Sequence, residues 1–283
     1  MLKVGIFVNR EKDEGFAITK EIINWLLINE FIVYIPYDLK IRHSNLNIVT
    51  KDLMYSESDF IIVLGGDGTI LGIARGLTKY DTPILGVNLG NLGFITEVEI
   101  KDIYTSLESI KNGNYSIEER MMIQADVYRD KTIINTLYAL NDVCITRGHL
   151  LKLVKLNAYV GKNFIDKYNA DGLLISTPTG STAYSLSAGG PIVSPTMSLM
   201  LITPICPHSL KSRTIVVSDK DDIIIEVSEH QNGEVYLTAD GQEVFKLLPK
   251  DKIHLIKAQC SLKLIKTTNR SFYDILRSKL KDR

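Results

Sequence analysis

The fold of this chain is decided by the stretch Ile61-Ile62-Val63-Leu64-Gly65-Gly66-Asp67-Gly68-Thr69. Its first four residues are apolar and mostly β-branched, which predicts a buried strand. A turn with three glycines and one aspartate follows directly, and residues 69–75 then have the pattern of a helix, with Thr69 as the expected N-cap. A strand that enters a helix through a glycine turn is typical of a phosphate site, because backbone N–H groups and the helix dipole favour an anion.

Asp67 is the unusual residue of this turn. A carboxylate beside bound phosphate is electrostatically costly, so it is expected to hold a metal ion, a hydroxyl group or a proton. Glycine and aspartate also suit a tight turn with no ligand. The chain has no Walker A sequence, and the dinucleotide fingerprint fails because its third glycine falls one residue late, at Gly72. By itself the turn leaves a phosphate site and a structural turn open.

Length and composition indicate an ordinary globular protein. The 283 residues are enough for two domains or one large domain, and 45% are hydrophobic and 23% charged. Lys and Arg together number 33, as do Asp and Glu, so the formal net charge is zero. This balance gives no sign of binding to nucleic acid or to an anionic membrane surface.

Cysteine usage and hydropathy predict a cytoplasmic location. Cys144, Cys206 and Cys260 are odd in number and far apart, which indicates buried small residues in a reducing compartment. The apolar run of residues 1–8 is too short for a signal peptide and predicts a strand. No apolar run approaches the roughly 20 residues of a membrane span.

The N-terminal part alternates between strand and helix patterns. Strands are predicted at residues 2–8, 31–35, 60–64 and 84–87, and a helix is predicted at 16–29. Alternation of this kind favours an α/β domain with a parallel sheet, which we expect over residues 1–115. Ligands of such sheets lie at the carboxyl ends of the strands. The turn at Gly66 and the loop at 88–94 are therefore expected to face one crevice.

From residue 116 to residue 269 the pattern changes to short strands with tight turns between them. The predicted strands are 121–128, 133–139, 153–160, 173–176, 200–203, 214–217, 223–227 and 235–238. They indicate an all-β domain with antiparallel sheets. A final helix is predicted from Phe272 to Leu280, and its apolar face is expected to return residues 270–283 to the first domain.

Two segments of the β domain have the composition of a ligand site. Residues 169–191 gather hydroxyls and glycines with almost no charge, and 182–187 predicts a short helix with Ser181 or Thr182 near its cap. Such a helix start could bind ribose, phosphate or an amide, although an ordinary Ser/Thr-rich loop has the same composition. Gly180-Ser181-Thr182 lacks the elbow of a serine nucleophile.

The second segment is Asn141-Asp142, which is expected to end a strand at 137–140. An amide beside a carboxylate suits a ribose diol or an adenine edge, and it equally suits a turn or a cap. The histidines are scattered without metal-ligand spacing, so the sequence assigns no protein-built transition-metal site.

Taken together, four blocks closely resemble the NAD kinase family of bacterial type. They are the turn at 65–69, the loop from Asn88 to Phe94, Asn141-Asp142, and Asp171-Gly172 leading into Thr177-Pro178-Thr179-Gly180-Ser181-Thr182-Ala183-Tyr184-Ser185. They occur in the order of the family and span essentially the whole chain. The first block is shared with phosphofructokinases and lipid kinases, whereas the last is much more specific.

The resemblance implies transfer of the γ-phosphate of ATP to the 2′-hydroxyl of the adenosine ribose of NAD, giving NADP. It places Asp67 and Gly68 at the reacting end and Phe94 near the dinucleotide. It implies that NAD is held by Asn141, Asp142, Asp171, Thr182, Ala183, Tyr184, Ser185, Leu186 and Ser187, with further contacts from Lys152, Asn169 and Gln242. It also suggests a homodimer or homotetramer built through the β domain.

The chemistry of phosphoryl transfer fits these residues. Asp67 can accept the proton of the attacking hydroxyl as a general base. The backbone of Gly65, Gly66, Gly68 and Thr69 is expected to meet the phosphates. No metal cage is evident, so a divalent ion, Mg²⁺, is expected to arrive with ATP.

Two other functions remain open from the sequence. One is a lipid kinase of the diacylglycerol type, which shares the Gly-Gly-Asp-Gly turn but would usually need a membrane-binding segment. The other is a module that senses NAD without catalysis, against which Asp67 argues because simple binding would not favour a carboxylate there.

Overall fold

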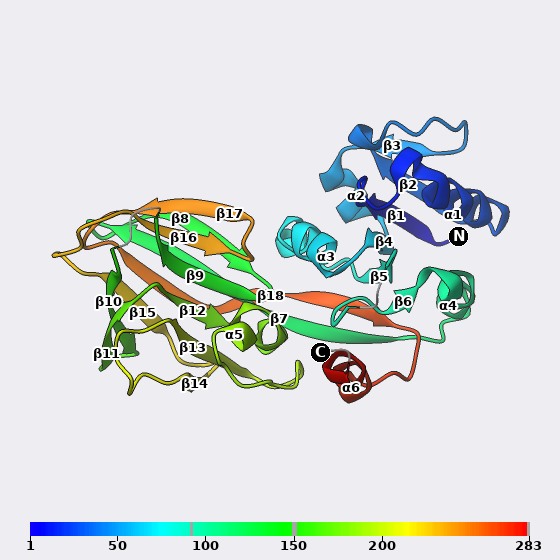
Figure 1. Ribbon diagram of the computed structural model, residues 1–283. Helices are drawn as coiled ribbons and strands as arrows, with labels where there is room; N and C mark the ends of the chain where they lie inside the picture. The colour runs from blue at the N-terminus through cyan, green and yellow to red at the C-terminus, as the bar shows by residue number, and fades with distance from the viewer. Residues whose placement is uncertain (91–92, 149–151, 282–283) are drawn as a thin grey trace. The chain divides into compact units, whose positions relative to one another are not determined.

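The computed structural model describes residues 1–90, 93–148 and 152–281, and the side chains of all of these except 280 and 281. The described chain forms two compact units (Figure 1). Unit 1 is Met1–Glu119 with Leu262–Arg283, and unit 2 is Arg120–Ser261. The long strands β7 (Ser116–Arg129) and β18 (Lys252–Lys266) each contribute residues to both units.

Unit 1 is the α/β domain that the sequence predicts. Its parallel strands lie in the order β5-β4-β1-β2-β3, and β6 and the end of β18 also pair with β5. The strands are β1 (Lys3–Val8), β2 (Ile32–Pro36), β3 (Asn47–Val49), β4 (Phe60–Gly65), β5 (Ile84–Asn88) and β6 (Val98–Glu99). The helices are α1 (Ala17–Ile28), α2 (Lys51–Glu57), α3 (Asp67–Ala74), α4 (Ile103–Lys111) and α6 (Phe272–Lys281).

Burial explains why the central strands carry almost only apolar residues. Every residue of β4 is buried, and Ile6 and Leu85 on neighbouring strands are fully buried as well. Helix α1 covers the sheet with Ile22 and Leu26, which are also fully buried. A parallel sheet covered in this way must be apolar on both faces, as the sequence pattern indicates.

The C-terminal helix belongs to unit 1, as predicted. Ile275 of α6 is only 6% exposed, and the ring centroid of Phe272 lies 6.2 Å from that of Phe94. The segment before α6 is held by buried Glu97, whose Oε1 accepts hydrogen bonds from the backbone N–H and the hydroxyl of Thr268 at 2.9 Å and 2.6 Å. The Lys266 ammonium pairs with the other oxygen of the same carboxylate.

Unit 2 is built from antiparallel sheets. One has the strand order β14-β13-β12-β9-β16-β17, and the other contains the neighbouring strands β11-β10-β15-β18. The hairpin of β7 and β8 adjoins β18. The strand bounds are β8 (Thr132–Ala139), β9 (Asp142–Arg147), β10 (Val154–Val160), β11 (Asn163–Ala170), β12 (Gly172–Ser176), β13 (Leu199–Ile205), β14 (Ile215–Ser218), β15 (Ile223–Val227), β16 (Val235–Ala239) and β17 (Glu243–Leu247).

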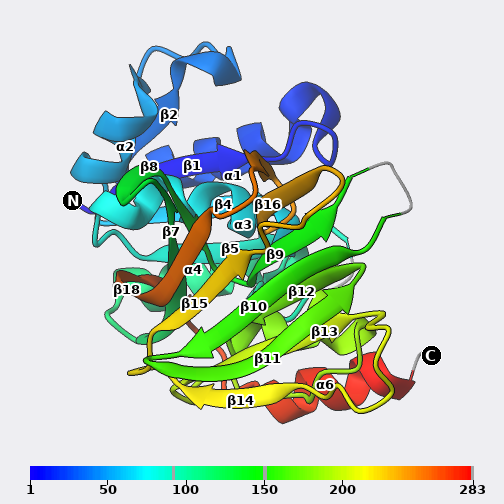
Figure 2. The ribbon, with the colours of Figure 1, turned by 90° about the vertical axis from the view of Figure 1, so that its left-hand side faces the viewer.

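The core of unit 2 lies between these sheets. Figure 2 shows β10, β11 and β15 as one layer with β9, β12 and β13 behind it. Leu156 and Ile225 from the first layer and Ile145 and Leu173 from the second are fully buried in one cluster. The alternating burial along β15 and β16 is the pattern of strands with one face in a core.

Several local predictions are wrong. Thr69 is not the N-cap of α3, because the carbonyl of extended Gly66 already accepts from the N–H groups of Thr69 and Ile70 and starts the helix at Asp67. Residues Thr179–Thr182 form a separate 3-10 helix, so the α-helix begins after Ala183, as α5 (Tyr184–Ser187). Asp142 does not end a strand but opens β9.

The cysteine prediction is correct only in part. All three cysteines are free, as expected. Cys144 is buried, whereas Cys206 is exposed and Cys260 is intermediate.

Candidate active site

In the glycine turn after β4, Gly65 leaves no room for a side chain, and a side chain at Gly66 would displace the end of Lys12. A Cβ atom at Gly65 would lie 2.2 Å from Oγ1 of Thr69, and one at Gly66 would lie 2.7 Å from Nζ of Lys12. Both distances are far below van der Waals contact. The turn therefore brings its backbone close to the start of α3 and to a lysine ammonium, which is the arrangement that a phosphate site needs.

Asp67 is the first residue of α3, and its carboxylate is held by the loop that follows β5. Oδ2 accepts from the backbone N–H of Phe94 at 2.7 Å, and Oδ1 accepts from those of Ile95 at 3.2 Å and Thr96 at 3.1 Å. A Cβ at Gly93 would lie 2.0 Å from Oδ1 of Asp67. The carboxylate thus occupies the space that the glycine leaves free, and the two motifs predicted to face one crevice are in contact.

A second hydrogen-bond network holds this loop in place. Asn88 Nδ2 donates to Thr96 Oγ1 at 3.2 Å, and Asn88 Oδ1 accepts from the N–H of Gly90 at 2.8 Å. Thr96 Oγ1 also accepts from the N–H of Gly93 at 2.9 Å. Asn88 and Thr96 are 3% and 2% exposed, so the loop is supported from inside unit 1. Asn91 and Leu92 of the same motif lie outside the described residues.

In unit 2 the structure brings Asn141 and Asp142 together with Ala183 and Tyr184, which come from a later part of the chain. They line a pocket of about 290 Å³ with Cys144, Thr146, Thr238, Asp240 and Gly241. Its size is at the lower end of the range for small-molecule sites.

Asp240 organises the wall of this pocket. Its carboxylate accepts from the backbone N–H groups of Leu140 at 2.9 Å, Asn141 at 2.8 Å and Asp142 at 3.2 Å. Asn141 Oδ1 is buried and finds no hydrogen-bond partner among the described residues. A buried acceptor of this kind is costly unless a ligand or water satisfies it, so it indicates a binding position in the pocket.

The electrostatics of the pocket centre on Asp142. Its side chain is 6% exposed, and burial, followed by the nearby charge of Asp240, raises its pKa to about 7. Near neutral pH this carboxyl therefore exists both with and without its proton. It can accept a hydrogen bond from a ribose hydroxyl or donate one to a ring nitrogen.

The hydroxyl-rich segment that begins at Thr177 is fixed to Asn141 by its first residues. Thr177 donates its hydroxyl to the carbonyl of Leu140 at 2.6 Å and its N–H to the carbonyl of Asn141 at 2.9 Å. A Cβ at Gly180 would lie 2.1 Å from that Asn141 carbonyl oxygen. This close approach explains why glycine stands between Thr179 and Ser181, and it sets the position of Ala183 and Tyr184.

Not every predicted residue reaches this pocket. Over the described ranges, its lining does not include Asp171, Lys152, Asn169, Gln242, Thr182, Ser185, Leu186 or Ser187. Asp171 Oδ1 pairs with Nε of Arg147 at 2.6 Å, and the hydroxyl of buried Ser185 lies 3.2 Å from that of Thr203. Lys152, Asn169, Ser187 and Gln242 are exposed.

Sequence reasoning also missed residues that the structure places at these sites. Asp240 and Gly241 form a turn after β16, and the Asp-Gly pair is a turn signal that marks their position but not their role. Cys144, Thr146 and Thr238 carry no signal in the sequence. Lys12 approaches the glycine turn only because of the path of the chain after β1.

Comparison with known proteins gives the same assignment for both halves of the chain. Residues 4–115 match the family model of the ATP-NAD kinase N-terminal domain, and residues 140–267 match that of the ATP-NAD kinase C-terminal domain. The NAD kinase of Thermoanaerobacter sp. (strain X514) is 47% identical over 285 residues, covering 100% of both chains. The NAD kinase of Caldanaerobacter subterraneus subsp. tengcongensis is 46% identical, also with full coverage of both.

Solved structures of kinases for NAD and NADH also resemble the chain. A yeast NADH kinase complexed with NADH matches with a TM-score of 0.86 at 26% identity, covering 98% of this chain and 86% of that one. An NAD kinase from Archaeoglobus fulgidus in complex with ATP matches with a TM-score of 0.78 over the full length of both chains, and at 23% identity it supports the fold alone. Within the described part of the chain, no helix has the length and apolarity to cross a bilayer.

Both domain models and several full-length relatives point to one group of phosphotransferases, and the chain therefore belongs to the NAD kinase family.

Proposed function

We propose that this protein transfers the γ-phosphate of ATP to the 2′-hydroxyl of the adenosine ribose of NAD, giving NADP and ADP. The observation that carries the proposal is the Asp67 carboxylate, which lies in the glycine turn at the start of α3 and accepts the backbone N–H groups of residues 94–96. A carboxylate in a phosphate-binding turn repels phosphate, so its presence requires a task that a neutral residue could not perform.

That task is general-base catalysis. A carboxylate has about four acceptor positions, and the loop residues 94–96 use three of those on Asp67. The remaining position can accept the proton of the ribose hydroxyl. As the hydroxyl oxygen forms its bond to the γ-phosphorus, the bond to the bridging oxygen of ADP breaks and the proton passes to Asp67.

The phosphates of ATP would meet the glycine turn. Gly65, Gly66, Gly68 and Thr69 form the last residue of β4 and the start of α3, where the helix dipole favours an anion. The Lys12 ammonium lies beside the backbone of Gly66 and supplies positive charge at the same place. Close approach of the phosphates to the backbone is possible because the three glycines carry no side chain.

We assign the binding of NAD to the pocket of unit 2. The orphaned Oδ1 of Asn141 and the carboxyl of Asp142 suit an amino group and ribose hydroxyls, and Tyr184 offers a ring that is 46% exposed. Asp171, Thr182, Ser185, Leu186, Ser187, Lys152, Asn169 and Gln242 stay as proposed contacts on the resemblance to the family alone. Phe94 is proposed near the dinucleotide on the same ground.

Mg²⁺ is proposed to arrive with ATP, because this ion usually keeps several waters and binds through one or two carboxylates and substrate phosphates. When bound, it would neutralise phosphate charge. A cytoplasmic location is supported by the three free cysteines. A homodimer or homotetramer is proposed from the family resemblance, and light scattering of the purified protein tests it.

The test is an assay of the full chain with NAD, ATP and Mg²⁺, in which NADP is measured by a reductase that accepts NADP but not NAD. NADP should form with ATP and fail to form without it. Incubation with diacylglycerol in vesicles in place of NAD should give no phosphorylated lipid. Phosphorylated lipid without NADP would identify a lipid kinase, and NAD binding without NADP formation would identify a sensing module.

A further inference from the structure

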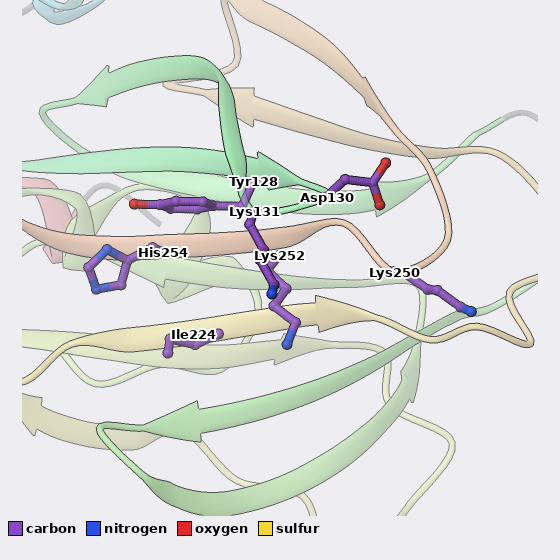
Figure 3. A pocket seen from close by; sticks show the side chains of 7 residues that line it. All are labelled: Tyr128, Asp130, Lys131, Ile224, Lys250, Lys252 and His254. Carbon is purple, nitrogen blue, oxygen red and sulfur yellow. The ribbon is translucent and has the colours of Figure 1, made fainter.

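Unit 2 contains a second cavity that shares no lining residue with the pocket at Asn141. It holds about 640 Å³ and is lined by Tyr128, Asp130, Lys131, Ile224, Lys250, Lys252 and His254. Figure 3 shows these side chains coming from the β7–β8 hairpin, from strands β15 and β18 and, for Lys250, from the turn that precedes β18. The volume is typical of sites for small organic ligands.

The backbone at one wall of this cavity is irregular. Asp130 and Lys131 form a two-residue turn between β7 and β8, and both have left-handed φ angles, 49° and 70°. Turns of this type favour Asn-Gly, because a side chain at the second position is strained. The hairpin register also shifts between Val127 and Tyr128, directly beside the turn. Strain and bulges are concentrated at binding sites, where they aim side chains.

The charge at the cavity is mainly positive. Among the described residues Lys131 has no ion-pair partner, and Lys252 reaches Glu226 only at 4.0 Å, the outer limit of an ion pair. Lys250 pairs with Glu229 at 2.6 Å, but both side chains are more than 60% exposed, so the pair contributes little. In Figure 3 the carboxylate of Asp130 points away from the rings. The lysines can therefore turn to an anion at small cost.

The opposite side of the cavity is formed by rings and an aliphatic side chain. The Tyr128 and His254 rings lie with centroids 6.4 Å apart at 64°, and Ile224 is the apolar residue beside them. His254 Nε2 lies 3.0 Å from Oδ2 of Asp222, which fixes the orientation of the imidazole. A planar molecule could pack against these groups, because aromatic side chains bind flat rings by stacking.

We propose that this cavity binds a small molecule that carries a phosphate group on or near a planar ring. The phosphate would be held by Lys131 and Lys252, and the ring would pack against Tyr128 and Ile224. Neither an uncharged ring nor a free phosphate would use both halves of the site. The proposal concerns a second site and does not depend on the phosphotransfer assigned above.

The test follows the His254 ring in the full-length protein by NMR, with its signals assigned from the spectrum of His254→Gln. The probe is 5′-AMP, and adenosine and inorganic phosphate are the comparisons that lack the charge or the ring. Titration with 5′-AMP should move the His254 signals to saturation. Adenosine and phosphate should each need at least about tenfold higher concentration for half of the shift.

Variants of Lys131 distinguish a loss of ligand binding at this cavity from a loss of stability of unit 2. Lys131→Gln keeps the strained backbone and removes the charge, so 5′-AMP should bind about three- to tenfold more weakly at His254. The matched control is Lys162→Gln in the β10–β11 turn, which should leave the titration unchanged. Lys131→Gly should raise the melting temperature by relieving the φ of 70°, while it still weakens binding.

Four results would overturn the proposal. They are no His254 shift with 5′-AMP, equal effects of Lys131→Gln and Lys162→Gln, titration by adenosine or phosphate equal to that by 5′-AMP, or a His254 shift that depends on protein concentration without ligand. The last would show that a second copy of the chain covers the cavity. The NMR titration needs no turnover, so its outcome is separate from that of the NADP assay.

Discussion

At the scale of single residues, two carboxylates hold loops in place through backbone N–H groups. Asp67 and Asp240 each accept three backbone N–H bonds, one from the loop after β5 and the other from the turn before β9. Hydrogen bonds to a charged acceptor are stronger than those between neutral groups. Each carboxylate therefore fixes a loop whose side chains or backbone face a proposed substrate.

Asp142 gives a pH-dependent prediction. Because burial raises its pKa to about 7, the folded protein keeps this proton between about pH 4 and pH 7, where the unfolded chain has lost it. The stability that comes from the proton is therefore present at low pH and is lost as the pH rises to about 7. Above that, the buried charge is a constant cost.

Asp142→Asn removes that cost and should raise the free energy of unfolding at pH 8. The gain should be smaller at pH 5 by about 2 kcal/mol. Denaturant unfolding at the two pH values measures this difference. Asp166→Asn, on an exposed stretch of β11, is the control and should show no such difference. A gain from Asp142→Asn that is equal at both pH values would mean that Asp142 is ionised across this range.

Tyr184 gives a prediction for binding. Its ring lines the pocket and is 46% exposed, so Tyr184→Ala should weaken NAD binding without unfolding the protein. The loss should be on the order of 1–3 kcal/mol, the usual contribution of an aromatic ring that stacks on a base. Calorimetric titration with NAD measures it. The control is Tyr115→Ala, at a position that is 45% exposed. Equal affinities of the two variants would remove Tyr184 from the site.

At the scale of elements, the sequence predicts strands better than it predicts their ends and their irregular neighbours. The buried runs of β1, β4, β5 and β15 lie where their apolar pattern places them. Among the described residues, six strands were not predicted, namely β3, β6, β9, β11, β17 and β18. Of these, β11 is largely exposed and its burial does not alternate clearly. The start of α3 was misplaced because the capping carbonyl belongs to Gly66, and a backbone atom leaves no signal in a sequence.

Helix α6 is the element whose position is easiest to test. Ile275 is 6% exposed, whereas the neighbouring Tyr273 is 65% exposed. Ile275→Ala should therefore lower the free energy of unfolding by about 2–4 kcal/mol, and Tyr273→Ala should change it by less than about 0.5 kcal/mol. Truncation after Thr268 should lower the melting temperature further. Thermal and denaturant unfolding measure all three variants, and a tail that packs on nothing would leave every curve unchanged.

At the scale of the whole molecule, the periodicity of the apolar residues predicts the two kinds of domain, and the motifs predict the function. Alternating strand and helix patterns predict the α/β unit, and short strands with turns predict the β unit. The residues of the proposed NAD pocket were predicted only in part. Asn141, Asp142, Ala183 and Tyr184 belong to motifs, but Cys144, Thr146 and Thr238 line the pocket only because the pairing of β9 with β12 and β16 brings them there.

The central claim is that Asp67 takes the proton of the ribose hydroxyl during phosphate transfer. The measurement is the turnover of Asp67→Asn with saturating NAD, ATP and Mg²⁺, alongside Asp81→Asn, whose side chain is 92% exposed. Asparagine keeps the shape and removes the basicity, so turnover should fall about 10²–10⁴-fold while NAD still binds, and Asp81→Asn should match the natural protein. Turnover of Asp67→Asn within a few-fold of the natural protein, or full recovery at higher Mg²⁺, would contradict the account.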